Sequence, residues 1–277
     1  MGLRISTNVA SINAQRSMAG SQREIQKAFS QLASGSRITK AADDAAGLSI
    51  SENLKSTIRS MTQASRNAND GISMIQVAEG GLGEVSNILT RLRELGIQAA
   101  SDTVGERERG FVNNEVQQLK AEMQRIAETS RYGNTNLLDG SGEVFDFQVG
   151  VNNIESQDRI SFDAGAMNAQ TGNLGVDGLD FSTKEGAQSA LEQLDTAQVQ
   201  VNGFRSTLGA LQNRLISTSD NLGVTHENFS AANSRVRDAD IAAATSEMTK
   251  NNILLNATTS VLAQANQFPA LSMKLLG

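Results

Sequence analysis

Residues 190–215 read ALEQLDTAQVQVNGFRSTLGALQNRL, and the fold follows from this stretch. Alternate steps of four and three residues from Ala190 to Ala239 land almost always on apolar side chains, which is the spacing of a helix in a coiled coil. These positions are Ala190, Leu194, Ala197, Val201, Phe204, Leu208, Leu211, Leu215, Thr218, Leu222, Thr225, Phe229, Ala232, Val236 and Ala239. At about 1.5 Å per residue, a helix over 186–240 is about 80 Å long.

Two further apolar patterns with helical spacing precede this stretch. One runs through Leu54, Ile58, Met61, Ser65, Ala68, Ile72, Ile75, Leu82, Val85, Leu89, Leu92 and Ala99, and the other through Val112, Val116, Leu119, Met123 and Ile126. Asp43 and Asp44 precede the first pattern and suit the N-terminus of a helix. Three such helices can share one core, so we expect a mainly α fold, an elongated antiparallel bundle of long helices resembling a coiled coil.

The middle of the chain changes to a period of two. Phe145, Phe147, Val149 and Val151 alternate with polar residues, and residues 159–162 offer a partner strand, so the pattern predicts a small β-hairpin. Residues 165–180 are rich in Gly, Asn and Asp. We expect them to form a loop with short strands at the exposed end of the helical rod.

The composition excludes several classes of protein. The net charge of −6 and the pI near 5.0 argue against a nucleic-acid partner, and the absence of Cys excludes disulfides and thiolate chemistry. No stretch of 18 apolar residues is present, so we expect no membrane span. The first residues lack the pattern of a cleaved signal peptide, and any export is expected to proceed without one.

Both ends of the chain are amphipathic but carry few charges. Residues 241–277 contain only Glu247, Lys250 and Lys274 as charged side chains. Such helices bury too little surface alone, so we expect residues 1–36 to be disordered in the monomer and both ends to fold on assembly. The side chains expected at a subunit interface are Ile5, Val9, Ile12, Ile25, Phe29, Leu32, Met248, Leu255 and Leu262.

Potential chemical sites have simpler interpretations. Asp43 and Asp44 are interpreted as helix caps, and His226 has no triad context. The glycines of 80–83 lack the spacing of a phosphate loop, and Asp177–Asp180 lacks the spacing of a calcium loop. We therefore predict no catalytic residue, cofactor or metal.

Four blocks of sequence resemble the bacterial flagellins. They are LASGSRITKAADDAAG (32–47), QASRNANDGIS (63–73), AANSRVRDADI (231–241) and MTKNNILL (248–255) continuing into VLAQANQ (261–267). The similarity covers about the first 140 and the last 90 residues, in the order and orientation of that family.

The resemblance implies an extracellular, self-assembling filament subunit for motility, exported by the flagellar type III apparatus. Residues 1–36 and 241–277 would be the inner-core helices, 37–43 a linker, 44–136 and 186–240 the rod, and 137–185 a short middle region. The implied partners are further copies of the chain, an export chaperone on the C-terminal helix, the filament cap and the hook-filament junction proteins. Other flagellins are an additional implied partner.

The resemblance also implies contact with the flagellin-sensing Toll-like receptor of animals. The residues concerned are Arg91 and Leu95 in RLREL (91–95), supported by Glu115. A contact between subunits would use the same surface equally well. Two alternatives to a filament subunit remain at this point, a hook-filament junction protein and another coiled-coil interaction protein.

Overall fold

The computed structural model describes residues 7–274, which form two compact units. Among the described residues, unit 1 comprises 7–58 and 228–274, and unit 2 comprises 59–227. The long helices α2 (Ala45–Ala99) and α5 (Lys184–Arg237) contribute residues to both. The expected mainly α fold is confirmed, and the strands are confined to two small antiparallel pairs.

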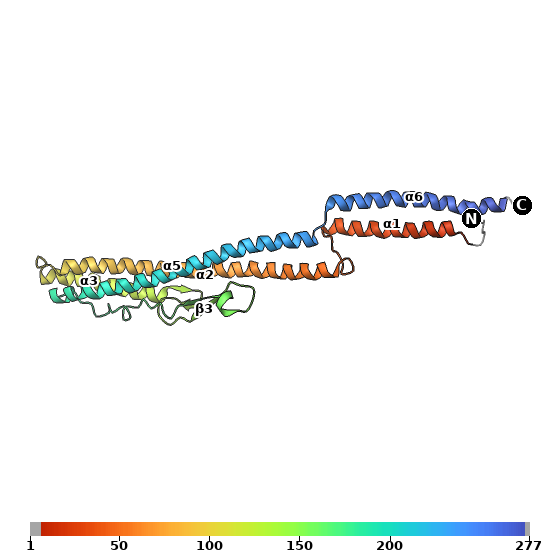
Figure 1. Cartoon of the computed structure of the whole chain (residues 1–277). Helices are drawn as coiled ribbons and strands as arrows, with labels where there is room; N and C mark the ends of the chain where they lie inside the picture. Colours follow the sequence, from red (N-terminus) through yellow and green to blue (C-terminus); the bar gives the residue numbers. More distant parts are fainter. Residues whose placement is uncertain (1–6, 275–277) are drawn as a thin grey trace. The chain divides into compact units, whose positions relative to one another are not determined.

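Helices α2, α3 (Glu106–Thr129) and α5 run alongside one another in unit 2 (Figure 1). Arg91 and Arg93 are two residues apart, so their side chains leave α2 about 200° apart. Arg91 bonds to Glu115 of α3 at 2.8 Å, and Arg93 bonds to Asp195 of α5 at 2.7 Å. The helices α3 and α5 therefore contact α2 along the two edges of its buried face, which includes Leu92.

The apolar positions predicted from helical spacing form the core of unit 2. Most are fully buried, among them Leu82, Val85, Leu89, Leu92, Val116, Met123, Leu194, Val201, Leu208 and Leu215. Burying one such side chain contributes about 1.5–3 kcal/mol relative to leaving it in water. Unit 2 thus has a continuous core of large side chains from all three helices.

The end of α2 is held by a buried arginine of α3. Arg109 donates from Nε to the carbonyl of Ala99 at 2.8 Å and from a terminal nitrogen to the carbonyl of Ser101 at 2.9 Å. The last carbonyls of a helix lack partners within the helix, so this side chain satisfies groups that would otherwise be left unpaired. Nearby, Lys184 at the start of α5 pairs with Asp102 at 2.7 Å.

The predicted hairpin is present in the middle region. β3 (Val144–Gln148) pairs antiparallel with β4 (Arg159–Asp163), with Phe145 opposite Phe162. The two rings stack with their centroids 6.2 Å apart. A short helix, α4 (Glu155–Asp158), lies in the connection.

A second, smaller hairpin follows α3. It consists of β1 (Arg131–Tyr132) and β2 (Thr135–Asn136). The turn contains Gly133 at φ +60°, a left-handed conformation that favours glycine.

Residues 165–180 form a loop as expected, but the expected short strands and exposed position are wrong, because the loop contains no strand and packs over the core of unit 2. Leu174, Val176, Leu179 and the adjoining Phe181 are buried in the same core as the helices. Lys120 is itself buried and donates to the carbonyl of Leu179 at 3.4 Å. The segment therefore completes the core and does not project from the end of the rod.

Unit 1 contains the two terminal helices. α1 (Val9–Ser34) and α6 (Ile241–Lys274) lie side by side and antiparallel (Figure 1). The same unit includes the first turns of α2 and the last turns of α5.

Candidate functional site

The two segments that connect to the terminal helices are hydrogen-bonded to each other. Gly35 ends α1 in a left-handed conformation, φ +67°, which is a common helix stop. Its carbonyl accepts from Ala239 N–H at 2.9 Å, and Arg37 N–H donates to the carbonyl of Arg237 at 2.7 Å. These backbone bonds fix where α1 ends relative to the start of α6.

Two arginine side chains reinforce this junction within unit 1. The Arg37 guanidinium donates to the carbonyl of Val236 at 2.8 Å. Arg237 forms an ion pair with Glu52 of α2 and lies 3.4 Å from the buried hydroxyl of Ser51. The junction therefore joins four helix ends, those of α1 and α5 and the starts of α2 and α6.

Of the two aspartates interpreted as helix caps, Asp44 caps α2 and Asp43 does not. Asp44 accepts from Gly47 N–H at 2.8 Å at the start of α2, and Asp240 accepts from Ala242 N–H at 2.9 Å at the start of α6. Asp43 instead accepts from the hydroxyl and the backbone N–H of Thr39 and from Lys40 N–H. The Thr39 hydroxyl and these backbone donors lower the pKa of Asp43 below its ordinary value of 3.8.

The helices α1 and α6 meet along a seam with alternating three- and four-residue spacing. Its inward positions are half-buried or buried: Ser11, Ala14, Met18, Ser21, Ile25, Ala28 and Leu32 on α1, and Ala244, Met248, Asn251, Leu255, Thr258, Leu262 and Ala265 on α6. At one end Asn8 donates to the carbonyl of Ala265 at 2.8 Å, and Ser11 donates to Asn266 at 3.0 Å. The seam is narrow and contains many small or polar side chains.

The structure divides the predicted interface residues into two groups. Ile25, Leu32, Met248, Leu255 and Leu262 point into the α1–α6 seam and are at least half-buried within the chain. Val9, Ile12 and Phe29 are 59%, 47% and 65% exposed. Ile5 lies outside the described residues. The second group remains available to a neighbouring molecule.

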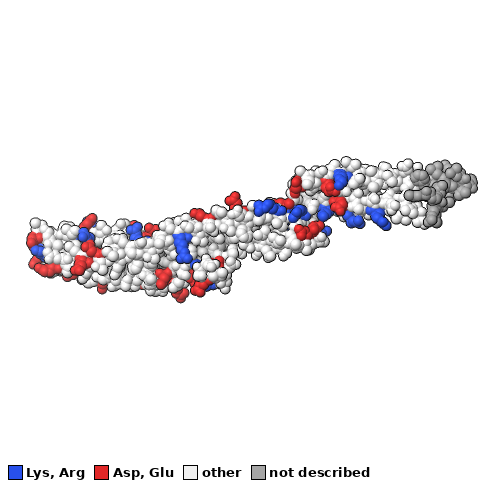
Figure 2. Space-filling view, viewed as in Figure 1, with Lys and Arg blue, Asp and Glu red and all other residues white. Residues whose placement is uncertain are grey.

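The outer face of α1 changes character along its length. Val9, Ile12, Arg16, Arg23 and Lys27 follow helical spacing on the side opposite the seam, and all five are exposed. The first turns of this face are therefore apolar, and the later turns are cationic. Apart from these cations the pair carries few charges, and its visible face is largely white in Figure 2.

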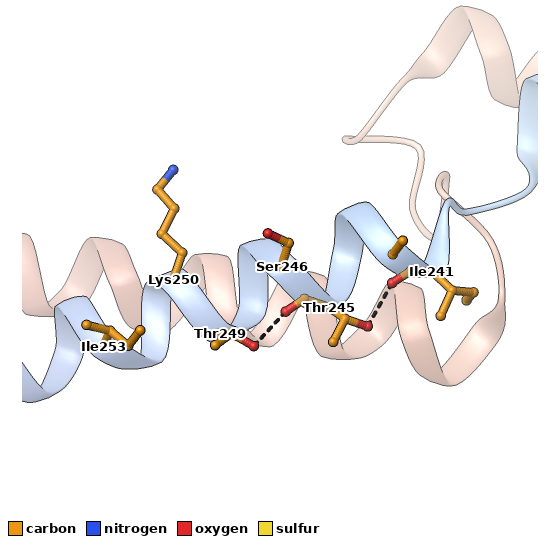
Figure 3. A pocket seen from close by; sticks show the side chains of 7 residues that line it. Ile241, Thr245, Ser246, Thr249, Lys250 and Ile253 are labelled. Carbon is orange, nitrogen blue, oxygen red and sulfur yellow. Dashed lines mark hydrogen bonds between the residues drawn. The ribbon is translucent and has the colours of Figure 1, made fainter.

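Sequence reasoning missed the outer face of α6. Ile241 and Ile253 are exposed at the two ends of a shallow groove whose floor is made of the small residues Ala242, Thr245, Ser246 and Thr249 (Figure 3). The hydroxyls of Thr245 and Thr249 donate to the carbonyls of Ile241 and Thr245, at 2.7 and 2.9 Å. Because these two hydroxyls are satisfied within the helix, Thr245 and Thr249 present their methyl groups to the groove, and Lys250 also lines it. The i, i+4 spacing of its small residues was the available signal.

The residues expected to contact a receptor are only partly brought together. Arg91 bonds to Glu115 at 2.8 Å and to Glu94 at 3.1 Å, and the side chains of Arg91 and Glu115 are 48% and 46% exposed. These carboxylates raise the pKa of Arg91 above its ordinary value. Leu95 is only 2% exposed because it continues the buried seam of α2, so it offers no surface to a partner in this conformation.

Other sequence features have structural roles. Gly81 packs closely, since a Cβ there would lie 2.7 Å from a methyl carbon of Leu138. His226 is half-buried on α5. Within residues 7–274, no group of three or more His, Asp or Glu side chains is arranged to hold a metal ion, and no helix is long and apolar enough to cross a membrane.

Comparison with known proteins agrees with this arrangement. Residues 5–143 match the bacterial flagellin N-terminal helical region, and residues 191–276 match the bacterial flagellin C-terminal helical region. A flagellin of Halalkalibacterium halodurans is 42% identical over 98% of this chain and 99% of its own length. A 30.7 kDa flagellar filament core protein of Treponema maltophilum is 37% identical over 95% of each chain.

A solved structure supports the same relationship. The crystal structure of Bacillus cereus flagellin is 29% identical and superposes with a TM-score of 0.51, covering 57% of this chain and 88% of that one. Both helical regions of the family are present, and the similarity to family members extends over nearly the whole chain. The chain therefore belongs to the bacterial flagellin family.

Proposed function

We propose that this chain polymerises through the outer faces of its α1–α6 pair, each copy completing the pair of its neighbour. The chain is a structural subunit of the extracellular flagellar filament and not an enzyme, as its family membership shows. The contact proposed between subunits is the one between their α1–α6 pairs. Its main support is the incomplete burial of apolar side chains on both terminal helices.

The exposed side chains of unit 1 would gain most from assembly. Val9 and Ile12 lie on the outer face of α1, and Ile253 and Val261 are more than half exposed on α6. Burying a few hundred Å² of apolar surface at about 25 cal/mol/Å² supplies several kcal/mol per subunit, enough to offset the ordering of the helices. Assembly is thus favoured without any strong charge pairing.

The two outer faces are different from each other, which determines the kind of assembly. The first turns of α1 present branched apolar side chains, and the groove on α6 presents small ones. A contact between unlike faces is heterologous, so it repeats from copy to copy and produces an open filament when the rotation does not close. Val9 and Ile12 of one copy therefore occupy the α6 groove of the next.

Seeded assembly followed by electron microscopy tests this proposal. The full chain is compared with a truncated chain of residues 44–240 and with the double variant Val9→Ser, Ile12→Ser. We expect filaments from the full chain only, and a critical concentration raised at least tenfold in the double variant. Val144→Ser, a similar change at an exposed position of unit 2, should assemble normally. Normal assembly of the double variant would contradict the proposal.

The exposed apolar face of α6 also bears on export of the chain and on its binding by other flagellar proteins. The chain leaves the cell through the flagellar type III apparatus, and a chaperone covers α6 beforehand because Ile253, Leu254 and Val261 are exposed there. The cap, the hook-filament junction proteins and any other flagellins meet the chain later, at the filament. Secretion assays in cells with and without the export apparatus test the first step, and retention of the chain is expected only without it.

A receptor contact, where one exists, uses Arg91 and Glu115. Both are exposed and already oriented by their mutual ion pair. Arg91→Ala should lower signalling in a receptor reporter assay without lowering the stability of the monomer. Leu95→Ala should lower both, because Leu95 belongs to the core. Equal signalling by Arg91→Ala and the parent chain would contradict this assignment.

A further inference from the structure

We infer that Phe111 of one copy inserts into a hollow on α5 of a neighbouring copy, forming a lateral contact between the unit 2 bodies. The contact rests on the proposed function because its partner is a second copy of the chain. It uses a surface that is separate from the α1–α6 pair, and it involves only residues of unit 2.

Phe111 is an unusually exposed aromatic side chain. It lies on α3 and is 65% exposed, whereas Phe162 and Phe181 of the same unit are fully buried. Arg107 lies one turn earlier on α3, is exposed and makes no ion pair with any described residue. Large aromatic side chains beside an arginine are the residues that most often anchor protein interfaces.

A matching hollow lies on the outer side of α5. It is shallow and is lined by Gln188, Leu191, Glu192, Asp195, Thr196 and Val199. Val199 is 71% exposed, so the apolar part of the hollow faces solvent in the single chain. The side chain of Leu191 forms the other apolar wall. An aromatic ring placed between them would remove both from water.

The charges around the two features are complementary. Asp195 is already bonded to Arg93 at 2.7 Å. Glu192 is exposed and, among the described residues, makes no ion pair. Seating Phe111 in the hollow would bring Arg107 of the first copy toward Glu192 of the second. Opposite charges at the rim of an interface favour the correct partner and accelerate its encounter.

The positions of Phe111, which acts as the knob, and of the hollow on α5 favour an open row of copies. They lie on α3 and α5, two different helices that contact α2 along the two edges of its buried face. Phe111 is one turn from Glu115, the partner of Arg91, and Leu191 is one turn from Asp195, the partner of Arg93. The knob and the hollow are therefore at nearly the same level along α2. A contact between two different surfaces is heterologous, so it repeats from copy to copy and gives an open row when the rotation does not close.

Disulfide trapping in assembled filaments tests the contact, since the chain contains no cysteine of its own. The double variant Phe111→Cys, Val199→Cys is assembled and oxidised, then examined on a denaturing gel without reductant. We expect a ladder of covalent multimers that disappears on reduction. Each single variant should give dimers at most. The control Val144→Cys, Val199→Cys pairs two exposed positions that the contact does not bring together, and should give no ladder.

The outcomes separate this contact from the proposed function. Filaments without a ladder in the Phe111→Cys, Val199→Cys variant would overturn the contact and leave terminal-helix assembly standing. Failure of the parent chain to form filaments would overturn the proposed function instead. Circular dichroism of the monomers is expected to match the parent chain, because the replaced side chains are exposed.

A charge exchange provides the second test. Arg107→Glu and Glu192→Arg should each raise the critical concentration about tenfold, a change of about 1.4 kcal/mol. The double variant should return close to the parent value, because it restores the opposite charges in reverse. Additive loss in the double variant would overturn the pairing of these two residues.

Discussion

The two units use the same helical spacing but very different side chains. In unit 2 the seam positions hold large residues such as Leu89, Leu92, Leu194 and Leu208, all fully buried. In unit 1 the fully or nearly buried seam positions include Ser11, Ala14, Ala28, Ala244, Asn251 and Ala265. The same helical spacing therefore buries much more apolar surface in unit 2 than in unit 1. Unit 2 is expected to be stable in one chain, and unit 1 to depend on neighbouring copies.

The largest expected effect comes from emptying the core of unit 2. Leu208→Ala should lower the free energy of unfolding by about 2–5 kcal/mol, because it removes buried methyl groups and leaves a cavity. Urea unfolding of the monomer followed by circular dichroism measures this change.

The matched change in unit 1 is Leu254→Ala, at an exposed position of α6. It should leave the unfolding of the monomer within about 0.5 kcal/mol of the parent chain. Its effect should appear in the critical concentration for assembly. If Leu208→Ala and Leu254→Ala lowered the stability of the monomer equally, the claim that only unit 2 is stable in one chain would be contradicted.

The next effect concerns the end of α2 in unit 2. Arg109→Met should cost about 1–3 kcal/mol, because the carbonyls of Ala99 and Ser101 lose their donors in a buried setting. Arg107→Met, two residues earlier and exposed, should leave the stability of the monomer nearly unchanged. Similar costs for both would show that the buried hydrogen bonds are not the cause.

Helix caps sharpen the comparison because the same interaction occurs in both units. Asp240 caps α6 through Ala242 N–H, and Thr183 caps α5 through Gly186 N–H at 3.1 Å. Removing either cap by substitution with Ala should cost about 1 kcal/mol. In unit 2 the loss should lower global stability. In unit 1 it should mainly increase hydrogen exchange in the first turns of α6, and unchanged exchange there would contradict this expectation.

The smallest effect is a pH dependence of the linker before α2. The folded pKa of Asp43 lies below its ordinary value of 3.8, so this carboxylate stabilises the fold above that pH and loses its contribution as the pH falls through the folded pKa. Asp43→Asn should remove this dependence. Hydrogen exchange of Lys40 N–H between pH 5 and pH 3 measures it, and an identical pH profile in both chains would refute the assignment.

Sequence periodicity predicted the core of unit 2 at the level of single residues. Leu82, Val85, Leu89, Leu194 and Leu208 are buried as expected because large apolar side chains at helical spacing have few alternatives. The same reasoning placed only the large apolar residues of the α1–α6 seam, such as Ile25 and Leu255. Hydroxyl and amide side chains at Ser11, Asn251 and Thr258 occupy seam positions that an apolar pattern does not reveal.

Two further differences arise from tertiary packing. The Gly- and Asn-rich composition of residues 165–180 indicated a loop, but nothing in it showed that Leu174, Val176 and Leu179 would return to the core. Leu95 was assigned to a contact by resemblance, although its spacing from Leu92 and Ala99 places it in the buried seam. For Leu95 the spacing along α2 was therefore the better guide to burial than the resemblance, whereas for residues 165–180 no spacing signal was available.

Hydrogen exchange of the monomer and of the assembled filament tests the central claim most directly. The account predicts that backbone amides in α1 and α6 exchange rapidly in the monomer and become strongly protected in the filament. Amides facing the core in α2, α3 and α5 of unit 2 should be protected in both states. Strong protection of α1 and α6 in the isolated monomer, equal to that of unit 2, would contradict the claim that neighbouring copies complete unit 1.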